Sequence, residues 1–165
     1  MKSWLLRSKK VLALKRGFTL VELLIVMGIL VALLAIVLIA LNPVRQFKQA
    51  HDTSRSNDVN AILNAVHQYA ADNKGVLPSG ITSTPQNVRK TGGVDLCATL
   101  VPTYLAQLPV DPTVGTNGTT TGSPVSDTQC ADAYNTAYQI SATSSNRVTV
   151  TGTAEIPGVV ISVTR

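Results

Sequence analysis

The chain of 165 residues has few of the residue types and motifs that mark common functional classes. Aromatic residues make up only 4% and are scattered, so they do not form the stacking surface of a single-strand nucleic-acid-binding protein. We find no Cys-x-x-Cys pair, no glycine-rich phosphate loop and no set of nucleophile, base and orienting acid. These absences argue against redox proteins, nucleotide-binding enzymes and hydrolases. We therefore expect no enzyme, no catalytic residue and no cofactor.

Positive charge is concentrated at the N-terminus. The chain carries 14 Lys and Arg against 9 Asp and Glu, a formal net charge of +5. Six of the bases and none of the acids lie within residues 1–17, which leaves 8 bases and 9 acids, a net −1, for the rest. A nucleic-acid-binding domain carries its basic surface on the folded part. The distribution indicates instead a basic leader in front of a membrane segment, and no direct nucleic-acid site.

An apolar run of 24 residues extends from Phe18 to Leu41, interrupted only by Thr19, Glu22 and Gly28. As a helix it is about 36 Å long, enough to cross a hydrocarbon core of about 30 Å. The bases before it predict that the N-terminus stays in the cytoplasm and that the remainder is exported. The run is too long for the apolar region of a secretory signal peptide, and no Ala-x-Ala site follows it. Residues 18–41 are therefore predicted to remain as a single-pass anchor.

An amphipathic helix is predicted over residues 44–74, within a segment 42–75. Asn42-Pro43 precedes it, and either one helix bends at this pair or a second helix starts there. Apolar residues recur on one face at helical spacing: Val59, Ile62, Leu63, Val66 and Ala70. The charged residues before and among them are interpreted as solvated surface groups: Lys48, Asp52, Arg55 and Asp58.

Residues 76–165 are predicted to form a globular head. Asp95 is expected to cap a short helix that runs through Val101. The strand pattern predicts a three-stranded antiparallel meander packed on the apolar face of the preceding helix: Ala137–Ala142, Arg147–Thr153 and Gly158–Thr164. The fold class is thus α+β, a long N-terminal helix packed on a small antiparallel sheet. The only two cysteines, Cys97 and Cys130, lie on the exported side, where an even pair indicates one disulfide.

The residues from Lys15 to Val26 read KRGFTLVELLIV. This segment resembles the class III signal of type IV pilins and pseudopilins, which combines a basic tail, Gly, Phe and an acid with an apolar helix. The resemblance implies that prepilin peptidase cuts between Gly17 and Phe18, and that a methyltransferase then methylates the new Phe18 amine. It also implies that Glu22 pairs with that amine on a neighbouring subunit, which would compensate an acid in an otherwise apolar segment.

The resemblance continues more weakly beyond the anchor. Residues 56–75 look like the second half of a pilin helix, and residues 104–112 are similar to the Tyr-Leu-x-x-Leu-Pro-x-Asp-Pro segment of major pseudopilins of type II secretion. Two positions depart from the family pattern. Val31 and Ile39 stand where many members have Gly and Pro, so a helix break is expected nearer Asn42-Pro43 than within residues 31–39.

The resemblance implies a structural subunit of a type IV pilus, used for adhesion, motility or DNA uptake. Its implied partners are copies of itself, the two processing enzymes, the pilus assembly machinery and the membrane. The subunit would be held in the cytoplasmic membrane and become extracellular on assembly. The alternative within the family is a pseudopilin of a type II secretion or competence machine. The alternative from another class is a single-pass membrane-anchored binding module.

Other candidate sites favour plain structural interpretations. His51 and His67 are 16 residues apart, whereas metal-binding pairs on a helix lie four apart. Asn117-Gly118-Thr119 matches a glycosylation sequon, but it is also a natural tight turn, and we favour the turn. Four aspartates lack the Asp-x-Asp spacing of a calcium loop and are expected to cap turns and helices, with no metal bound: Asp95, Asp111, Asp127 and Asp132.

Overall fold

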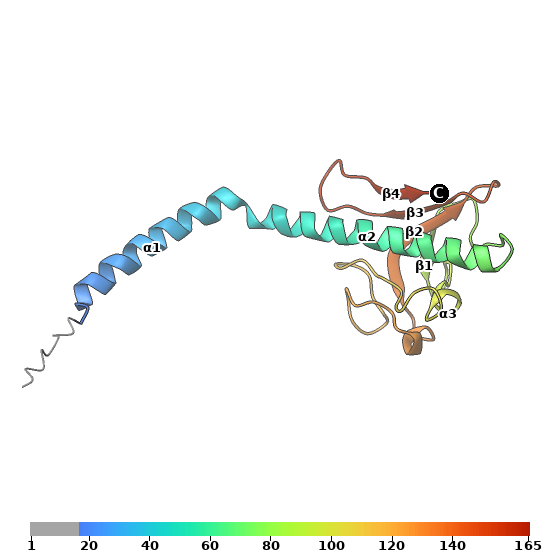
Figure 1. The fold of residues 1–165 in the computed structure, drawn as a ribbon, viewed down its shortest axis with the longest axis horizontal. Helices are drawn as coiled ribbons and strands as arrows, with labels where there is room; N and C mark the ends of the chain where they lie inside the picture. Colours follow the sequence, from blue (N-terminus) through green and yellow to red (C-terminus); the bar gives the residue numbers. More distant parts are fainter. Residues whose placement is uncertain (1–16) are drawn as a thin grey trace, which may run out of the picture. The chain divides into compact units, whose positions relative to one another are not determined.

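The computed structural model describes residues 17–165 and divides into two compact units (Figure 1). The first unit ends at Asn42, and the second spans Pro43–Arg165. Except for Gly17, the basic leader predicted over residues 1–17 lies outside the described residues.

The described part of the first unit is essentially one helix, α1 (Leu20–Leu41), preceded by the exposed residues 17–19. None of its residues is buried within the unit. Among residues 17–165, α1 is the one helix that is long and apolar enough to cross a membrane. It ends at Asn42, which adopts the left-handed conformation with φ 42°. This ending terminates the helix just past the apolar run.

The second helix, α2, spans Pro43–Asp72. Proline fits the first position of a helix, because the N–H that it lacks would have no partner within the helix at that position. A second helix thus starts at Pro43, which decides between the two alternatives that the sequence left open. Lys74 and Gly75 follow α2 with positive φ, and the Gly75 N–H donates to the Ala70 carbonyl at 2.7 Å. The predicted helix over residues 44–74 is confirmed within two residues at each end.

The head contains a four-stranded antiparallel sheet of order β1-β2-β3-β4. Three strands confirm the predicted meander: β2 (Asn135–Ala142), β3 (Val148–Gly152) and β4 (Ile161–Thr164). The first strand, β1 (Gln86–Arg89), was not predicted. It contains only one apolar residue, Val88, which is fully buried, so it has no alternating pattern to reveal it.

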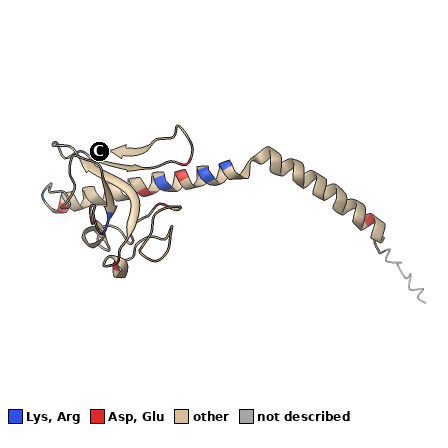
Figure 2. Ribbon diagram, turned by 180° about the vertical axis from the view of Figure 1, so that it is seen from behind, with Lys and Arg blue, Asp and Glu red and all other residues tan. Residues whose placement is uncertain are grey.

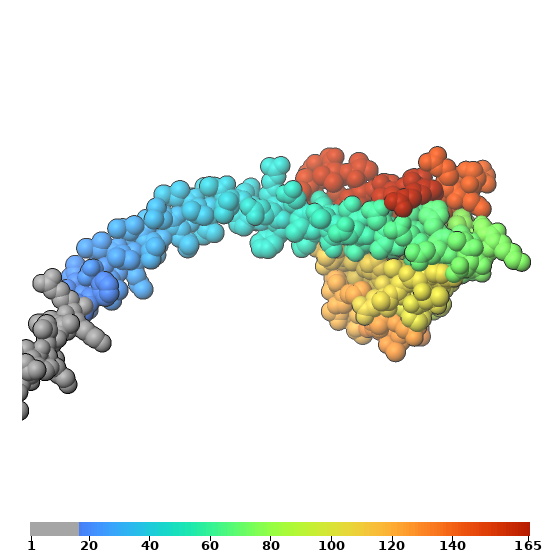
Figure 3. Space-filling model, in the orientation of Figure 1, coloured from blue at the N-terminus to red at the C-terminus, as the bar shows by residue number. Residues whose placement is uncertain are grey.

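One face of the sheet packs against α2 and forms the core of the head. The short helices α3 (Cys97–Leu100) and η1 (Asp127–Gln129) belong to the loop-rich region between β1 and β2. In Figure 3, α2 runs across the head with the C-terminal strands along one side and this region along the other. Completely buried side chains from α2 and the sheet meet in the core: Val59, Ile62, Leu63, Val66, Tyr138, Ile140, Val148 and Val150. The predicted α+β class is confirmed.

Candidate processing and assembly site

Gly17 and Phe18 lie in exposed backbone just before α1. The Phe18 side chain is 78% exposed. Apart from the two neighbouring residues, no described residue has an atom within 4 Å of the place where a side chain at Gly17 would begin. The peptide bond between the two residues is therefore outside the helix, where a protease can take up an extended segment.

The start of α1 is fixed by a cap that includes Glu22. Thr19 has extended backbone angles, and its Oγ1 accepts a hydrogen bond from the Glu22 N–H at 3.2 Å. Glu22 occupies the first helical turn, where a negative charge is favoured by the helix dipole. The carboxylate is thus placed one turn from Phe18, on the exposed surface of α1.

A buried cluster of charges joins α2 to the head. The Arg55 cluster consists of Arg55, Asp52, Asp111 and Glu155. Arg55 is 1% exposed, and its guanidinium donates to Asp111 through Nε at 2.6 Å and Nη2 at 3.0 Å. Nη1 donates to Asp52 at 2.8 Å, and Nη2 to Glu155 at 2.9 Å. The cluster connects α2, the loop after Leu108 and the turn between β3 and β4.

Backbone groups complete the same cluster. The Asp52 carboxylate accepts from the N–H groups of Glu155 at 2.8 Å and Ile156 at 3.0 Å. The Asp111 carboxylate accepts from the Thr113 N–H at 2.8 Å and thereby caps a turn. Burial alone would raise the pKa of Asp111, but hydrogen bonds from Arg55 and Thr113 outweigh it and lower the pKa to about 2. The cluster is therefore charged at neutral pH.

The prediction that Asp52 and Arg55 are solvated surface groups is wrong, because both are buried. Figure 2 shows two basic positions at the start of α2, followed by acidic and basic positions that alternate. Asp52 and Arg55 lie seven and four residues before Val59, so they continue the apolar stripe rather than the solvated face. Their helical spacing from Val59 indicates burial, whereas their charge indicates exposure to solvent, and the prediction followed the charge. Lys48 is exposed, as predicted.

Acidification should lower the free energy of unfolding of the head, because the acids of this cluster become protonated. A group whose folded pKa is depressed contributes stability above its unfolded pKa and loses it as the pH falls through the folded value. The pKa of Asp111 is lowered from 3.8 to about 2 in the folded head. The free energy of unfolding should therefore fall by about 2 kcal/mol between pH 5 and pH 2. The lowered pKa of Asp52 acts in the same direction, whereas Asp58, whose pKa is raised by burial, opposes it.

This pH dependence is measured by chemical unfolding in detergent, followed by the near-ultraviolet circular dichroism of the buried tyrosines. The control is Asp111→Asn, which should be less stable at pH 7 and should lose much of the change below pH 5. A wild-type stability that stays constant from pH 5 to pH 2 would contradict the assignment.

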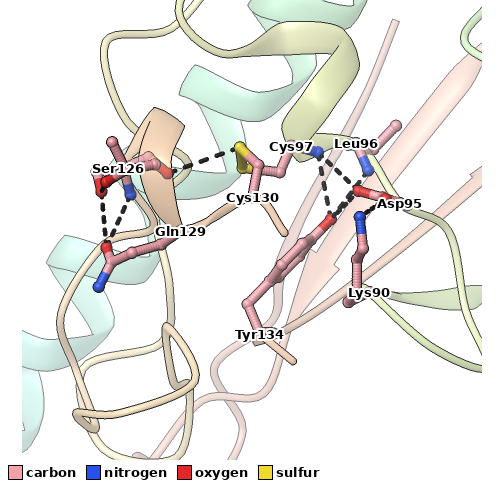
Figure 4. Close-up of a disulfide and its surroundings, with 9 residues drawn as sticks. Lys90, Asp95, Leu96, Cys97, Ser126, Gln129, Cys130 and Tyr134 are labelled. Carbon is pink, nitrogen blue, oxygen red and sulfur yellow. Dashed lines mark hydrogen bonds and ion pairs between the residues drawn. A yellow bond between two sulfur atoms is a disulfide. The ribbon is translucent and has the colours of Figure 1, made fainter. Parts of the chain in front are cut away.

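The structure joins Cys97, at the start of α3, to Cys130, which directly follows η1. Figure 4 shows Tyr134 beside this disulfide, with its hydroxyl donating to Asp95 Oδ1 at 2.6 Å. The same hydroxyl accepts from the N–H of Cys97 at 3.2 Å, and Lys90 pairs with Asp95 at 2.9 Å. Burial, followed by the bond to Asp95, raises the pKa of Tyr134, so the phenol stays neutral. Asp95 Oδ1 also accepts from the Cys97 N–H at 3.2 Å, but the N-cap of α3 is Leu96, so the expected cap at Asp95 is displaced by one residue, and the helix ends at Leu100 rather than running through Val101.

We expect the disulfide to stabilise the head substantially. The two cysteines are 33 positions apart, and the loop-entropy model gives about 4 kcal/mol for closing such a loop. The double variant Cys97→Ser with Cys130→Ser should lose about 2–4 kcal/mol of unfolding free energy. Reductant should lower the stability of the wild type and leave that of the variant unchanged. Alkylation of both thiols in unreduced, exported protein would contradict the pairing.

Two of the remaining candidates, Asn117 and His51, make structural contacts in the head. Asn117 is buried, and its Oδ1 accepts from the N–H groups of Thr119 at 3.1 Å and Thr120 at 2.9 Å, which makes the predicted tight turn. His51 Nδ1 pairs with Glu155 Oε1 at 2.9 Å, and His67 is only partly buried. Within residues 17–165, no three His, Cys, Asp or Glu side chains form a group that could hold a metal ion.

Comparison with known proteins bears on the N-terminal part of the chain. Residues 12–41 match the family model described as the prokaryotic N-terminal methylation motif. No curated protein and no solved structure matches the chain. The matched residues include Gly17, Phe18, Glu22 and all of α1. This motif points to a structural subunit, processed by prepilin peptidase and assembled at a membrane. The match of this class III signal supports a precursor of the type IV pilin or pseudopilin type.

Proposed function

We propose that the chain is a structural subunit of an extracellular type IV pilus, stored in the cytoplasmic membrane before assembly. The observation that carries the proposal is an exposed Gly17-Phe18 bond just before a helix that, apart from Glu22, is apolar on every side. Cleavage at this bond leaves Phe18 as the first residue and removes the six bases of the leader. The mature subunit then begins with its apolar helix.

A helix such as α1 is suited to two apolar environments. In a bilayer its exposed Leu, Ile and Val side chains contact lipid. In a filament the same side chains contact copies of α1 and are removed from water. Because lipid tails are about as apolar as leucine, the exchange between these environments requires little hydrophobic work. The subunit can therefore be stored in one environment and polymerised in the other.

Glu22 supplies the specific contact in this proposal. Cleavage creates an amine at Phe18, and a methylated amine keeps its positive charge. In a filament core with little water, the Glu22 carboxylate of one subunit would pair with the Phe18 amine of its neighbour. Such a pair stabilises the alignment of neighbouring subunits in which both charges are compensated. Alignments that leave either charge unpaired are less stable.

The second candidate is a pseudopilin of a type II secretion or competence machine. It is favoured by the resemblance of residues 104–112 to major pseudopilins. Leu108 in this segment is completely buried, and Asp111 belongs to the Arg55 cluster. The segment therefore has a structural role in the head. This role is compatible both with a type IV pilus and with a secretion or competence machine. A membrane-anchored binding module would require neither cleavage nor the pairing of Glu22.

The test replaces Gly17 with leucine, which blocks close approach of the backbone to a protease. Gly17→Leu should leave a full-length precursor in the membrane and no filaments in material sheared from the cell surface. Gly28→Leu is the matched control, since Gly28 lies inside α1 with nothing within 4 Å of an added side chain. This control should be processed normally. Cleavage of the Gly17→Leu variant before Phe18 at the wild-type rate would refute the proposal.

A further inference from the structure

The first two turns of α2, residues 43–50, extend beyond the part of the helix that the head covers. The first buried residue of α2 is Asp52, and every residue from Pro43 to Ala50 is exposed. Two of these residues are large and apolar: Val44 is 62% exposed and Phe47 is 67% exposed. We call residues 43–50 the uncovered segment. Its apolar side chains require an explanation, because the head does not bury them.

The uncovered segment combines these apolar residues with positive charge. Val44 and Phe47 are three residues apart and share one side of the helix, while Arg45 and Lys48 share the neighbouring side. No acid lies between Glu22 and Asp52. The chain from residue 52 onward holds 6 bases and 8 acids, a net −2. Positive charge on the exported side before the head is thus confined to this segment, whose basic positions are visible at the start of α2 in Figure 2.

Chain connectivity places the uncovered segment beside the anchor. Only Asn42 separates the end of α1 from Pro43. Between Pro43 and Lys48 a helix rises only about 8 Å, which is comparable to the thickness of the headgroup region of one leaflet, about 5–8 Å. Amphipathic helices that lie in the membrane interface bury phenylalanine and leucine at this level, and basic side chains extend along apolar surface to reach lipid phosphates.

We propose that the uncovered segment docks on the outer surface of the membrane while the subunit is stored there, and that it binds anionic phospholipid headgroups. Arg45 and Lys48 pair with the headgroup phosphates, and Phe47 inserts beside them. The inference rests on the proposed function only in that α1 spans a membrane. Docking holds the head at a defined height above the bilayer, and it must be released when the subunit enters a filament.

The test uses fluorescence in the full-length chain, in which Trp4 is the only tryptophan. Phe47→Trp is combined with Trp4→Phe, and the protein is reconstituted into vesicles of phosphatidylcholine alone or with phosphatidylglycerol. Insertion is checked first by flotation after alkaline extraction. Quenching of the indole by the neutral molecule acrylamide should be about threefold weaker in the anionic vesicles than in phosphatidylcholine alone. The reason is that each basic side chain raises the affinity for an anionic surface about fivefold. High salt should remove this protection.

Two controls separate docking from other effects. Val114→Trp with Trp4→Phe reports from the head, where Val114 is 65% exposed, and should be quenched equally in both lipids. Arg45→Gln with Lys48→Gln should abolish the protection of the Phe47→Trp indole. Lys74→Gln with Arg147→Gln makes the same change of charge at exposed sites on the head and should preserve it.

Three results would overturn the inference. Equal quenching of the Phe47→Trp indole in both lipids would show that the segment does not recognise anionic headgroups. Protection that follows the protein-to-lipid ratio rather than lipid charge would assign the surface to a second copy of the chain. Protection that survives Arg45→Gln with Lys48→Gln would show that the two bases do not bind the lipid. The experiment requires an inserted α1 but no filament, so its outcome is separate from that of the Gly17→Leu test.

Discussion

Replacing Glu22 with alanine should abolish filaments while leaving the subunit abundant in the membrane and normally cleaved. Glu22 is the only acid between Phe18 and Leu41. In lipid its removal eliminates an unfavourable group, so the anchored subunit should be at least as stable. In a filament core it leaves the Phe18 amine of a neighbour unpaired, at a cost of about 3–5 kcal/mol per subunit. A cost of that size, repeated at each addition, prevents growth.

The measurement is the ratio of sheared surface filament to total membrane subunit by immunoblot. Glu22→Gln keeps the shape and a hydrogen bond but loses the charge, and it should assemble nearly as poorly as Glu22→Ala. Thr19→Ala is the matched control, because it removes the cap that receives the Glu22 N–H and leaves the carboxylate in place. It should cost about 1 kcal/mol at the helix start and still assemble. Wild-type filament yield from Glu22→Ala would show that no such charge pair is needed.

Replacing Arg55 with alanine should have the largest effect of any single substitution on the stability of the head. The side chains of Asp52 and Asp111 are 7% and 2% exposed, so both carboxylates would remain buried without their cation. Removing one partner of a buried ion pair costs about 3–5 kcal/mol. Arg55→Lys should be intermediate, because an ammonium group cannot reproduce the two parallel bonds to Asp111. Chemical unfolding in detergent at neutral pH measures both losses.

Arg147→Ala provides the comparison for this stability test. Arg147 is exposed, and its removal should change the unfolding free energy by no more than about 0.5 kcal/mol. A double variant, Arg55→Met with Asp111→Leu, should recover part of the loss of Arg55→Ala, since it removes one of the two unpaired buried carboxylates and leaves only Asp52 without its cation. If Arg55→Ala were as mild as Arg147→Ala, the cluster would not be the contact that joins α2 to the head.

The features predictable from the sequence are those encoded locally. The basic tail, Gly17, Phe18 and Glu22 stand within a short motif followed by a long apolar run, so local sequence is enough to predict the candidate processing and assembly site. The face of α2 and three strands follow from helical and alternating periodicity. The sequence pattern did not predict strand β1, because Val88 is its one apolar residue and its pairing with β2 is set by the tertiary fold.

The Arg55 cluster could not be predicted in the same way. Its members come from α2, from a loop 56 residues later and from a turn 100 residues later, so no local pattern connects them. The position of Arg55 on the apolar stripe was visible in the sequence. Burying a guanidinium becomes favourable only when several acceptors surround it, and that condition depends on the folded head.

Mass spectrometry of sheared surface filaments tests the central claim most directly. Trypsin cuts after Arg16 and Arg45, so an unprocessed chain yields a peptide from Gly17 to Arg45. We expect instead a peptide from Phe18 to Arg45 that is heavier than its sequence by one CH2, because a methyl group replaces a hydrogen on the Phe18 amine. Filaments whose subunits still carry Gly17, or surface material that lacks the chain altogether, would contradict the claim that this is a processed filament subunit.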